Sequence, residues 1–161
     1  MLLFFKGVDM SASFTVRIAT RDDATSIAEF NVIFAKASEN RQLSLPVTAA
    51  GVRHVFDSFN NGLYVVAEQE GKVIGVTMVT REWSDWNNGT FYCIQDIFVL
   101  AQDPQKIIHD ALLEKVRTLA KEHENVCGIR LYAHKDDTQS QEHYEKLNLK
   151  KTPYRIYDEV F

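Results

Sequence analysis

The feature that most constrains the fold is a helix-type pattern between two strand-type runs in the second half of the chain. Residues 90–100 and 127–133 are rich in apolar and β-branched residues, and Asp103-Pro104 breaks the first run. Between them, a helix ending near His123 is predicted from the apolar positions Ile107, Ile108, Ala111, Leu112, Val116 and Leu119. Such a helix can carry the chain across a sheet, so the pattern predicts an α/β fold with a crossover helix.

The first part of the chain supplies a strand and two helices. Residues 14–19 alternate as a strand does, and Thr20–Asp23 resembles a capping box with acidic residues in the first helical turn. The helix that follows should bury Ala24, Ile27, Ala28, Val32 and Phe34. A second helix is predicted from Thr48 to about Phe59, where Asn60-Asn61-Gly62 stops it. Its inward residues would be Val52, Val55, Phe56 and Phe59.

Strand patterns dominate the remainder of the chain. The additional runs predicted to be strands are 63–67, 73–79 and 152–161. The first two are joined by a hairpin-type connection at Gln69–Lys72, and a polar and aromatic loop at 81–89 precedes the strand at 90–100. A helix opening near Asp137 follows the strand at 127–133. The resulting order of elements, β-α-α-β-β-β-α-β-α-β, predicts a mostly antiparallel sheet.

Composition excludes several classes of function. The chain has 161 residues, suited to one domain over residues 13–161, and residues 1–12 are expected to be an extension, with Met10 an alternative start. A net charge of -4 without a Lys/Arg-rich block makes nucleic acid and anionic membranes poor partners. Two cysteines and five histidines without ligand spacing predict no metal and no disulfide framework. No run is long enough to span a membrane, and a cytoplasmic location is expected.

The helix that ends in Tyr144-Glu-Lys-Leu-Asn-Leu149, after the strand at 127–133, resembles the signature of the GNAT N-acetyltransferases. Asn148-Leu149 stands where that family usually has Gly-Phe, and asparagine tolerates the left-handed conformation of a helix C-terminus. The element order is similar to the GNAT fold from Phe14 onward. The resemblance implies an α/β (α+β) fold of about six to seven strands flanked by about four helices. Residues 80–89 and 94–99 also look like a bacterial subgroup that carries a Glu-Trp-Ser-Asp-Trp block.

The resemblance implies acetyl-CoA as co-substrate and assigns two roles. Backbone N–H groups near Phe98 and Val99, where two strands splay apart, would bind the thioester oxygen. The Tyr144 phenol would protonate the departing thiolate, a general acid contribution of about 10²–10⁴ in rate. The alternative for Tyr144 is a tyrosine packed on a helix face.

The sequence assigns the general base less specifically, and its candidates are Asp96, Glu82 and Asp85. Asp96 follows Gln95 where polyamine-acetylating relatives have a Glu-Asp pair, and each carboxylate could instead be a solvated surface group. Trp83 and Trp86 could form a wall for a cationic amine, or could pin the loop to the sheet.

The pyrophosphate loop departs from the family pattern Arg/Gln-x-x-Gly-x-Gly/Ala. A gap-free alignment places Pro104, Gln105, Lys106, Ile107, Ile108 and His109 on the motif, so both small positions are lost. Lys106 and His109 could bind phosphate through side chains, whereas Asp110 and Asp137 add negative charge near the expected cofactor site. A loss of one or two charge-assisted hydrogen bonds would weaken cofactor binding by roughly tenfold to a few thousandfold.

Two functions follow from these residues. The first is an N-acetyltransferase that acts on a small-molecule primary amine by direct transfer in a ternary complex, and the resemblance suggests a homodimer. The second is a GNAT-like domain that has lost catalysis and serves as a binding or interaction module.

Overall fold

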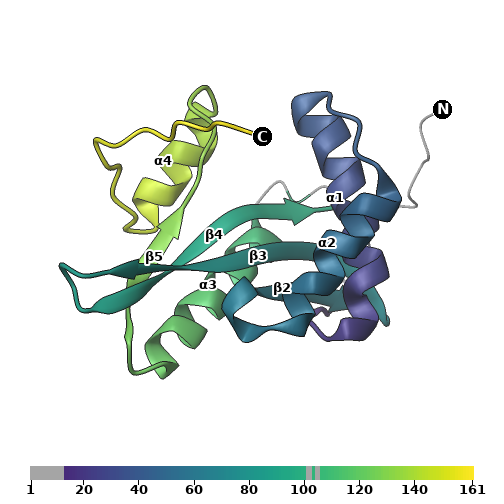
Figure 1. Ribbon diagram of the computed structural model, residues 1–161, viewed down its shortest axis with the longest axis horizontal. Helices are drawn as coiled ribbons and strands as arrows, with labels where there is room; N and C mark the ends of the chain where they lie inside the picture. The colour runs from purple at the N-terminus through teal and green to yellow at the C-terminus, as the bar shows by residue number, and fades with distance from the viewer. Residues whose placement is uncertain (1–12, 101–102, 104–105) are drawn as a thin grey trace. The chain divides into compact units, whose positions relative to one another are not determined.

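The computed structural model describes residues 13–100, 103 and 106–161, so the expected extension at residues 1–12 lies outside it. Its strands are β1 (Thr15–Ile18), β2 (Leu63–Gln69), β3 (Lys72–Ser84), β4 (Gly89–Val99) and β5 (Val126–Leu131). Its α-helices are α1 (Ala24–Glu39), α2 (Leu45–Asp57), α3 (Ile107–Glu122) and α4 (Thr138–Lys146), with 3-10 turns η1 (Arg21–Asp23) and η2 (Phe59–Asn61). Figure 1 shows their arrangement. None of the described helices is long and apolar enough to cross a bilayer.

The five strands form one mixed sheet in the order β1-β2-β3-β4-β5. Neighbours from β1 to β4 are antiparallel, and β4 and β5 are parallel. The parallel pair is the one that α3 connects, which confirms the crossover helix. The α/β fold is therefore confirmed, with five strands in the described residues instead of six to seven.

The expected strand at residues 152–161 is wrong. These residues form no strand, and all of them are exposed. An alternating pattern is typical of a strand that buries one face, and in this segment neither set of alternating side chains is buried.

The expected loop at residues 81–89 is also wrong, because most of it belongs to a long hairpin. Pairing between β3 and β4 continues through Trp83↔Thr90 and Ser84↔Gly89. Only residues 85–88 form the turn, which is closed by the N–H of Asn88 donating to the carbonyl of Asp85 at 3.2 Å. The polar residues of this segment obscured its strand character, since both faces of a hairpin tip are exposed to water.

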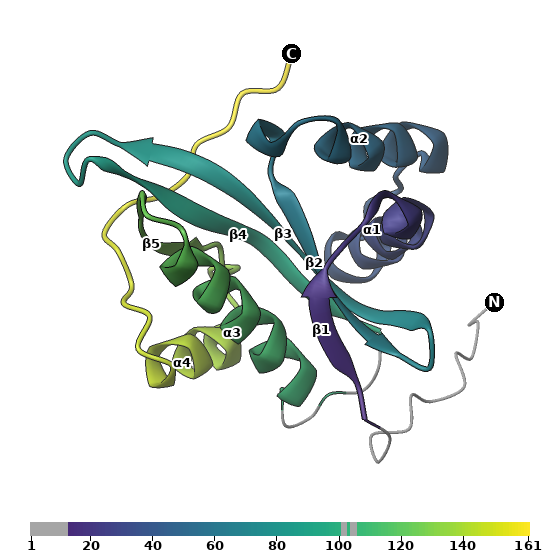
Figure 2. The same ribbon diagram turned by 90° about the horizontal axis from the view of Figure 1, so that it is seen from below.

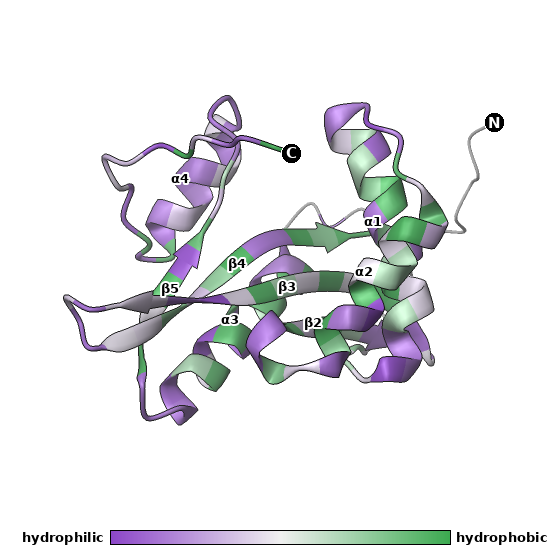
Figure 3. Ribbon diagram, viewed as in Figure 1, coloured by the Kyte–Doolittle hydropathy of each residue, from purple (hydrophilic) through white to green (hydrophobic). Residues whose placement is uncertain are grey.

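Helices cover both faces of the sheet, with α1 and α2 on one face and α3 on the other (Figure 2). On the first face, Tyr64, Val66 and Val76 pack against buried residues of α1 and α2. On the second face, α3 lies against all five strands. It packs closely on Gly75, where a Cβ atom would lie 3.2 Å from side-chain atoms of both Ile108 and Leu112. Figure 3 shows apolar residues concentrated along the middle strands, whereas the hairpin tip is mostly polar.

The local predictions for the first helix are largely confirmed. Thr20 and Asp23 form the reciprocal capping box of η1, which immediately precedes α1. The prediction for the second helix is wrong at Phe59, which was expected to face inward. It lies in η2 beyond the end of α2, is 60% exposed, and carries the Arg81 guanidinium 3.2 Å from its ring centroid. It is therefore not a core residue.

The chain divides into two compact units, one ending at Leu131 and the other formed by Tyr132–Phe161. In the second unit, the Asp137 side chain caps α4 by accepting a hydrogen bond from the N–H of Ser140 at 3.0 Å. At the other end, Asn148 adopts the left-handed conformation (φ 64°). The N–H groups of Leu149 and Asn148 donate to the carbonyls of Tyr144 and Glu145, each at 3.0 Å. This is a Schellman motif, so the conformation expected of Asn148 is confirmed.

Candidate active site

A β-bulge interrupts β4 at Gln95 and Asp96. The register of β3 and β4 shifts between the pairs Thr77↔Ile97 and Val79↔Ile94, so these two residues together oppose Met78. The buried Thr77 hydroxyl donates a 2.6 Å hydrogen bond to the carbonyl of Asp96. A bulge redirects side chains as well as bending the strand, and here Gln95 and Asp96 both line one cavity.

This cavity lies between the sheet and residues of α1 and α2, and its volume is about 220 Å³. Its apolar wall is aromatic. The Phe34 and Phe98 rings have centroids 5.0 Å apart, and Phe30 supports Phe98 from the edge at 5.7 Å. Its polar lining residues are Asn31, Thr48, Tyr64, Thr77, Gln95, Glu39, Arg41 and Asp96. The cavity therefore offers both hydrogen-bonding groups and charge beside an aromatic wall.

Asp96 is the titratable group that the cavity perturbs most. Asp96 is an exposed residue, but neighbouring protein atoms partly desolvate its carboxylate, and Glu39 repels it. Burial first and Glu39 second raise the pKa of Asp96 to about 6. A carboxylate with this pKa is ionised at neutral pH and is a stronger base than an ordinary aspartate.

Neutral polar groups in the cavity are already oriented by neighbours. The Gln95 Nε2 donates to Thr80 Oγ1 at 2.7 Å, which directs its carbonyl oxygen elsewhere. Burial raises the pKa of Tyr64, while a hydrogen bond with Asn31 opposes that shift. Tyr64 therefore remains a neutral phenol that can donate or accept a hydrogen bond.

One edge of β4 opens immediately beyond the bulge. The parallel pairing with β5 ends at Ile94↔Leu131, whereas pairing with β3 continues to Val99. The Leu100 N–H donates to the Ile74 carbonyl at 2.9 Å, toward β3. Because backbone groups alternate between the two edges of an antiparallel strand, Phe98 also faces β3, and Ile97 and Val99 face the opposite edge. Of the two expected donors, Val99 is the one directed to the open edge.

The first N–H groups of α3 are capped by an internal carboxylate. Asp103 Oδ1 accepts from the Ile107 N–H at 2.7 Å, and its Oδ2 accepts from the N–H groups of Ile108 and His109 at 2.9 and 3.0 Å. Lys106 precedes the helix in the left-handed conformation (φ 54°). The Ile108 side chain is buried against the sheet, so only its backbone is available to a ligand. Gln105 lies outside the described residues.

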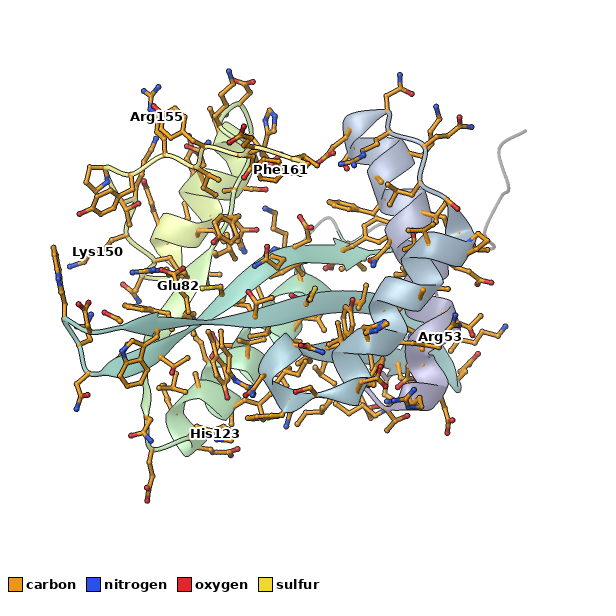
Figure 4. The ribbon with its side chains drawn as sticks, in the orientation of Figure 1. Arg53, Glu82, His123, Lys150, Arg155 and Phe161 are labelled. Carbon is orange, nitrogen blue, oxygen red and sulfur yellow. The ribbon has the colours of Figure 1, made fainter. Side chains whose placement is uncertain are left out.

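The structure does not bring all predicted site residues together. The cavity lining includes Asp96 but none of the hairpin residues Glu82, Trp83, Asp85 and Trp86. Trp83 is five residues along β3 from Met78, a separation of roughly 17 Å. Both tryptophans are exposed, at 61% and 89%, so they do not pin a loop to the sheet. Glu82, labelled in Figure 4, instead forms an ion pair with Arg130 of β5.

Other predicted residues lie on α3 and in the second unit. His109 Nδ1 is 3.1 Å from Asp110 Oδ1 in the first turn of α3. Tyr144 is half-buried near the end of α4, and Asp137 begins that helix. Their catalytic and cofactor roles stay predictions.

Sequence reasoning missed Asn31, Glu39, Arg41, Tyr64, Thr77 and Asp103. Asp103 had a partial signal, since aspartate is a favoured capping residue, although α3 begins only at Ile107. The others come from helices and strands distant in sequence, and no local pattern marks them.

The sequence model of the acetyltransferase (GNAT) family matches residues 33–149. A possible acetyltransferase from Clostridium difficile 630 is 33% identical, with a TM-score of 0.82 over 92% of this chain and 97% of that chain. An aminoglycoside N-acetyltransferase in complex with CoA is 13% identical, with a TM-score of 0.76 over 95% and 98%. A ribosomal-protein-alanine N-acetyltransferase from Brucella melitensis biovar Abortus 2308 is 15% identical, with a TM-score of 0.70 over 92% and 100%. No curated protein matches the sequence.

Proposed function

Because the chain belongs to the acetyltransferase (GNAT) family, we propose that it transfers an acetyl group from acetyl-CoA to a primary amine of a small molecule. The observation that carries this proposal is the β4 bulge. It turns Asp96 into the cavity while the adjacent residues Ile97 and Val99 direct backbone groups to the open edge of β4. An amine in the cavity and a thioester on the edge would meet within a few residues of one strand.

The proposed reaction is a direct transfer within a ternary complex. The amine binds as an ammonium ion, and Asp96 accepts its proton. The free amine then attacks the thioester carbonyl carbon, and the Val99 N–H stabilises the developing oxyanion. As the tetrahedral intermediate collapses, the C–S bond breaks and the CoA thiolate receives a proton from the Tyr144 phenol. The attacking nitrogen loses its second proton to solvent, and proton exchange with solvent returns Asp96 to the carboxylate and Tyr144 to the phenol.

Asp96 suits the role of base because its ionised form is available at neutral pH. An amine acceptor has a solution pKa of roughly 10, so it arrives protonated. A carboxylate with a pKa of about 6 holds an ammonium by charge and receives its proton more readily than an ordinary aspartate does. Glu39 contributes a second negative charge to the same cavity.

A second function, binding without transfer, is favoured by the Asp103 cap. In the family, N–H groups at this helix start bind the pyrophosphate of the cofactor, and here the Asp103 carboxylate accepts three of them. An anion must displace Asp103 to use these groups. If it cannot, the domain would bind ligands in its cavity but transfer nothing.

The decisive experiment measures thiol release from acetyl-CoA over a panel of amines, together with the mass of each product. The transferase predicts an acetylated amine whose formation falls at least about a hundredfold in Asp96→Asn. Asp22→Asn, which removes an exposed carboxylate from η1, is the matched control and should retain full activity. No product with any amine, together with no thermal stabilisation at millimolar acetyl-CoA, would favour the binding module.

A further inference from the structure

The cavity lining contains an acidic and a basic residue, Glu39 and Arg41, one on each side of Asn40 in the sequence. Asn40 ends α1 in the left-handed conformation (φ 51°), and the Arg41 N–H turns back to donate to the Ala35 carbonyl at 3.0 Å. Glu39 and Arg41 flank this reversal, and both line the cavity that contains Asp96. The Asn40 side chain is fixed in turn by Lys36 Nζ at 2.7 Å. The end of α1 therefore presents one acidic and one basic group to the same space.

Among the residues that the structure describes, neither Glu39 nor Arg41 has an ion pair. Glu39 is close enough to Asp96 to repel its carboxylate, and this repulsion helps to raise the pKa of Asp96. The two carboxylates therefore lie near each other in a cavity lining that also includes the Arg41 guanidinium.

The size of the cavity restricts what can bridge these groups. Its volume of about 220 Å³ is below the roughly 300–1,000 Å³ typical of sites for drug-sized ligands. A polycation would also place positive charge near Arg41. A compact molecule with an ammonium group and an acidic group avoids both problems, because each of its charges meets an opposite charge.

We propose that the acceptor is a small amino acid-type molecule, whose ammonium binds at Asp96 and Glu39 and whose carboxylate binds Arg41. This inference rests on the proposed function and names the substrate class of the same cavity. Arg41 is then a specificity residue. Its planar guanidinium suits bidentate binding of a carboxylate, while the aromatic wall of Phe34 and Phe98 accommodates the carbon skeleton.

The test compares the proteinogenic amino acids with their amides and with amines that lack the carboxylate. Thiol release from acetyl-CoA gives kcat/KM for each acceptor, and thermal unfolding without acetyl-CoA gives the rise in Tm that each produces. We expect at least one amino acid to exceed its amide in kcat/KM by about tenfold to a hundredfold, the worth of a charge-assisted hydrogen bond. The same amino acid should raise Tm more than its amide does.

Arg41→Gln should abolish this preference by raising KM for the acid until its kcat/KM approaches that of the amide. Arg53→Gln removes a cation from the exposed face of α2 (Figure 4), outside the cavity, and should keep the preference. Equal use of acids and amides, or better use of polyamines than of any amino acid, would overturn the inference while leaving the transferase intact. Arg41-dependent binding of amino acids without transfer to any amine would overturn the transferase and the role of acceptor, while the ligand class of the cavity would stand.

Discussion

Thr77 and Asp96 are joined across the bulge, where the Thr77 hydroxyl donates to the Asp96 carbonyl at 2.6 Å. Thr77 is 1% exposed, so this bond lies in a dry environment, where an unpaired carbonyl would be costly. The bulge is thereby fixed, and with it the direction of the Asp96 side chain. The acidic side of the cavity is set by the backbone of β4 and not by a mobile loop.

Replacement of Asp96 by asparagine is expected to remove the acidic limb of the pH–rate profile. Because the pKa of Asp96 is raised to about 6, its base form is lost as the pH falls through that value. In the native protein kcat/KM should therefore rise with pH through about 6. Asp96→Asn should lower kcat/KM by about a hundredfold or more and flatten this limb. A limb near 6 that persists in the variant would assign the titration to another group.

Replacement of Tyr144 by phenylalanine should lower kcat by about 10²–10⁴ if its phenol protonates the thiolate. The dissociation constant of acetyl-CoA, measured by calorimetry, should stay nearly constant, because only a hydroxyl is removed. Tyr154→Phe is a suitable control, since Tyr154 lies in the exposed C-terminal segment. An unchanged kcat in Tyr144→Phe would leave this residue as a packed helix residue.

Replacement of Asp103 by asparagine should tighten acetyl-CoA binding by roughly tenfold, about 1.4 kcal/mol. The change removes a negative charge that competes with phosphate, and asparagine still caps a helix. Calorimetric titration provides the dissociation constants. Pantetheine, which has no phosphate, should bind the two proteins equally well. Weaker acetyl-CoA binding in Asp103→Asn would show that the carboxylate supports the donor site.

Replacement of Gly62 by alanine should destabilise the fold by roughly 1–3 kcal/mol. Gly62 has a φ of 122°, and a Cβ atom there would lie 2.5 Å from the Val79 carbonyl oxygen. Gly51→Ala is the matched control, because Gly51 lies within α2 and a Cβ atom there would meet nothing within 4 Å. This control should gain about 0.5–1 kcal/mol. Urea denaturation gives both values, and a stable Gly62→Ala would contradict the close approach.

Local signals predicted the elements well where one short segment decides the outcome. The capping box at Thr20 and Asp23 needs only four residues, and the left-handed Asn148 needs only the end of one helix. The crossover helix α3 was also readable, because its apolar face has a clear helical period. Each of these predictions is confirmed.

Features that depend on residues distant in the sequence could not be predicted from local sequence patterns. The bulge at Gln95 and Asp96 is a property of register between β3 and β4, which no single strand reveals. Folding brings Arg41 and Asp96 into the lining of the same cavity, although the two residues are far apart in the sequence. The prediction of a strand at residues 152–161 failed because strand propensity in a segment does not supply a neighbouring strand to pair with.

Both tryptophans of the chain, Trp83 and Trp86, lie at the tip of the β3–β4 hairpin with most of their surface in water. Their fluorescence emission should already resemble that of free indole in the native state. Unfolding of the core would then change the emission little, so tryptophan fluorescence would misjudge stability, and circular dichroism is the better probe. The same placement makes these residues a spectroscopic reporter of whatever contacts the hairpin tip.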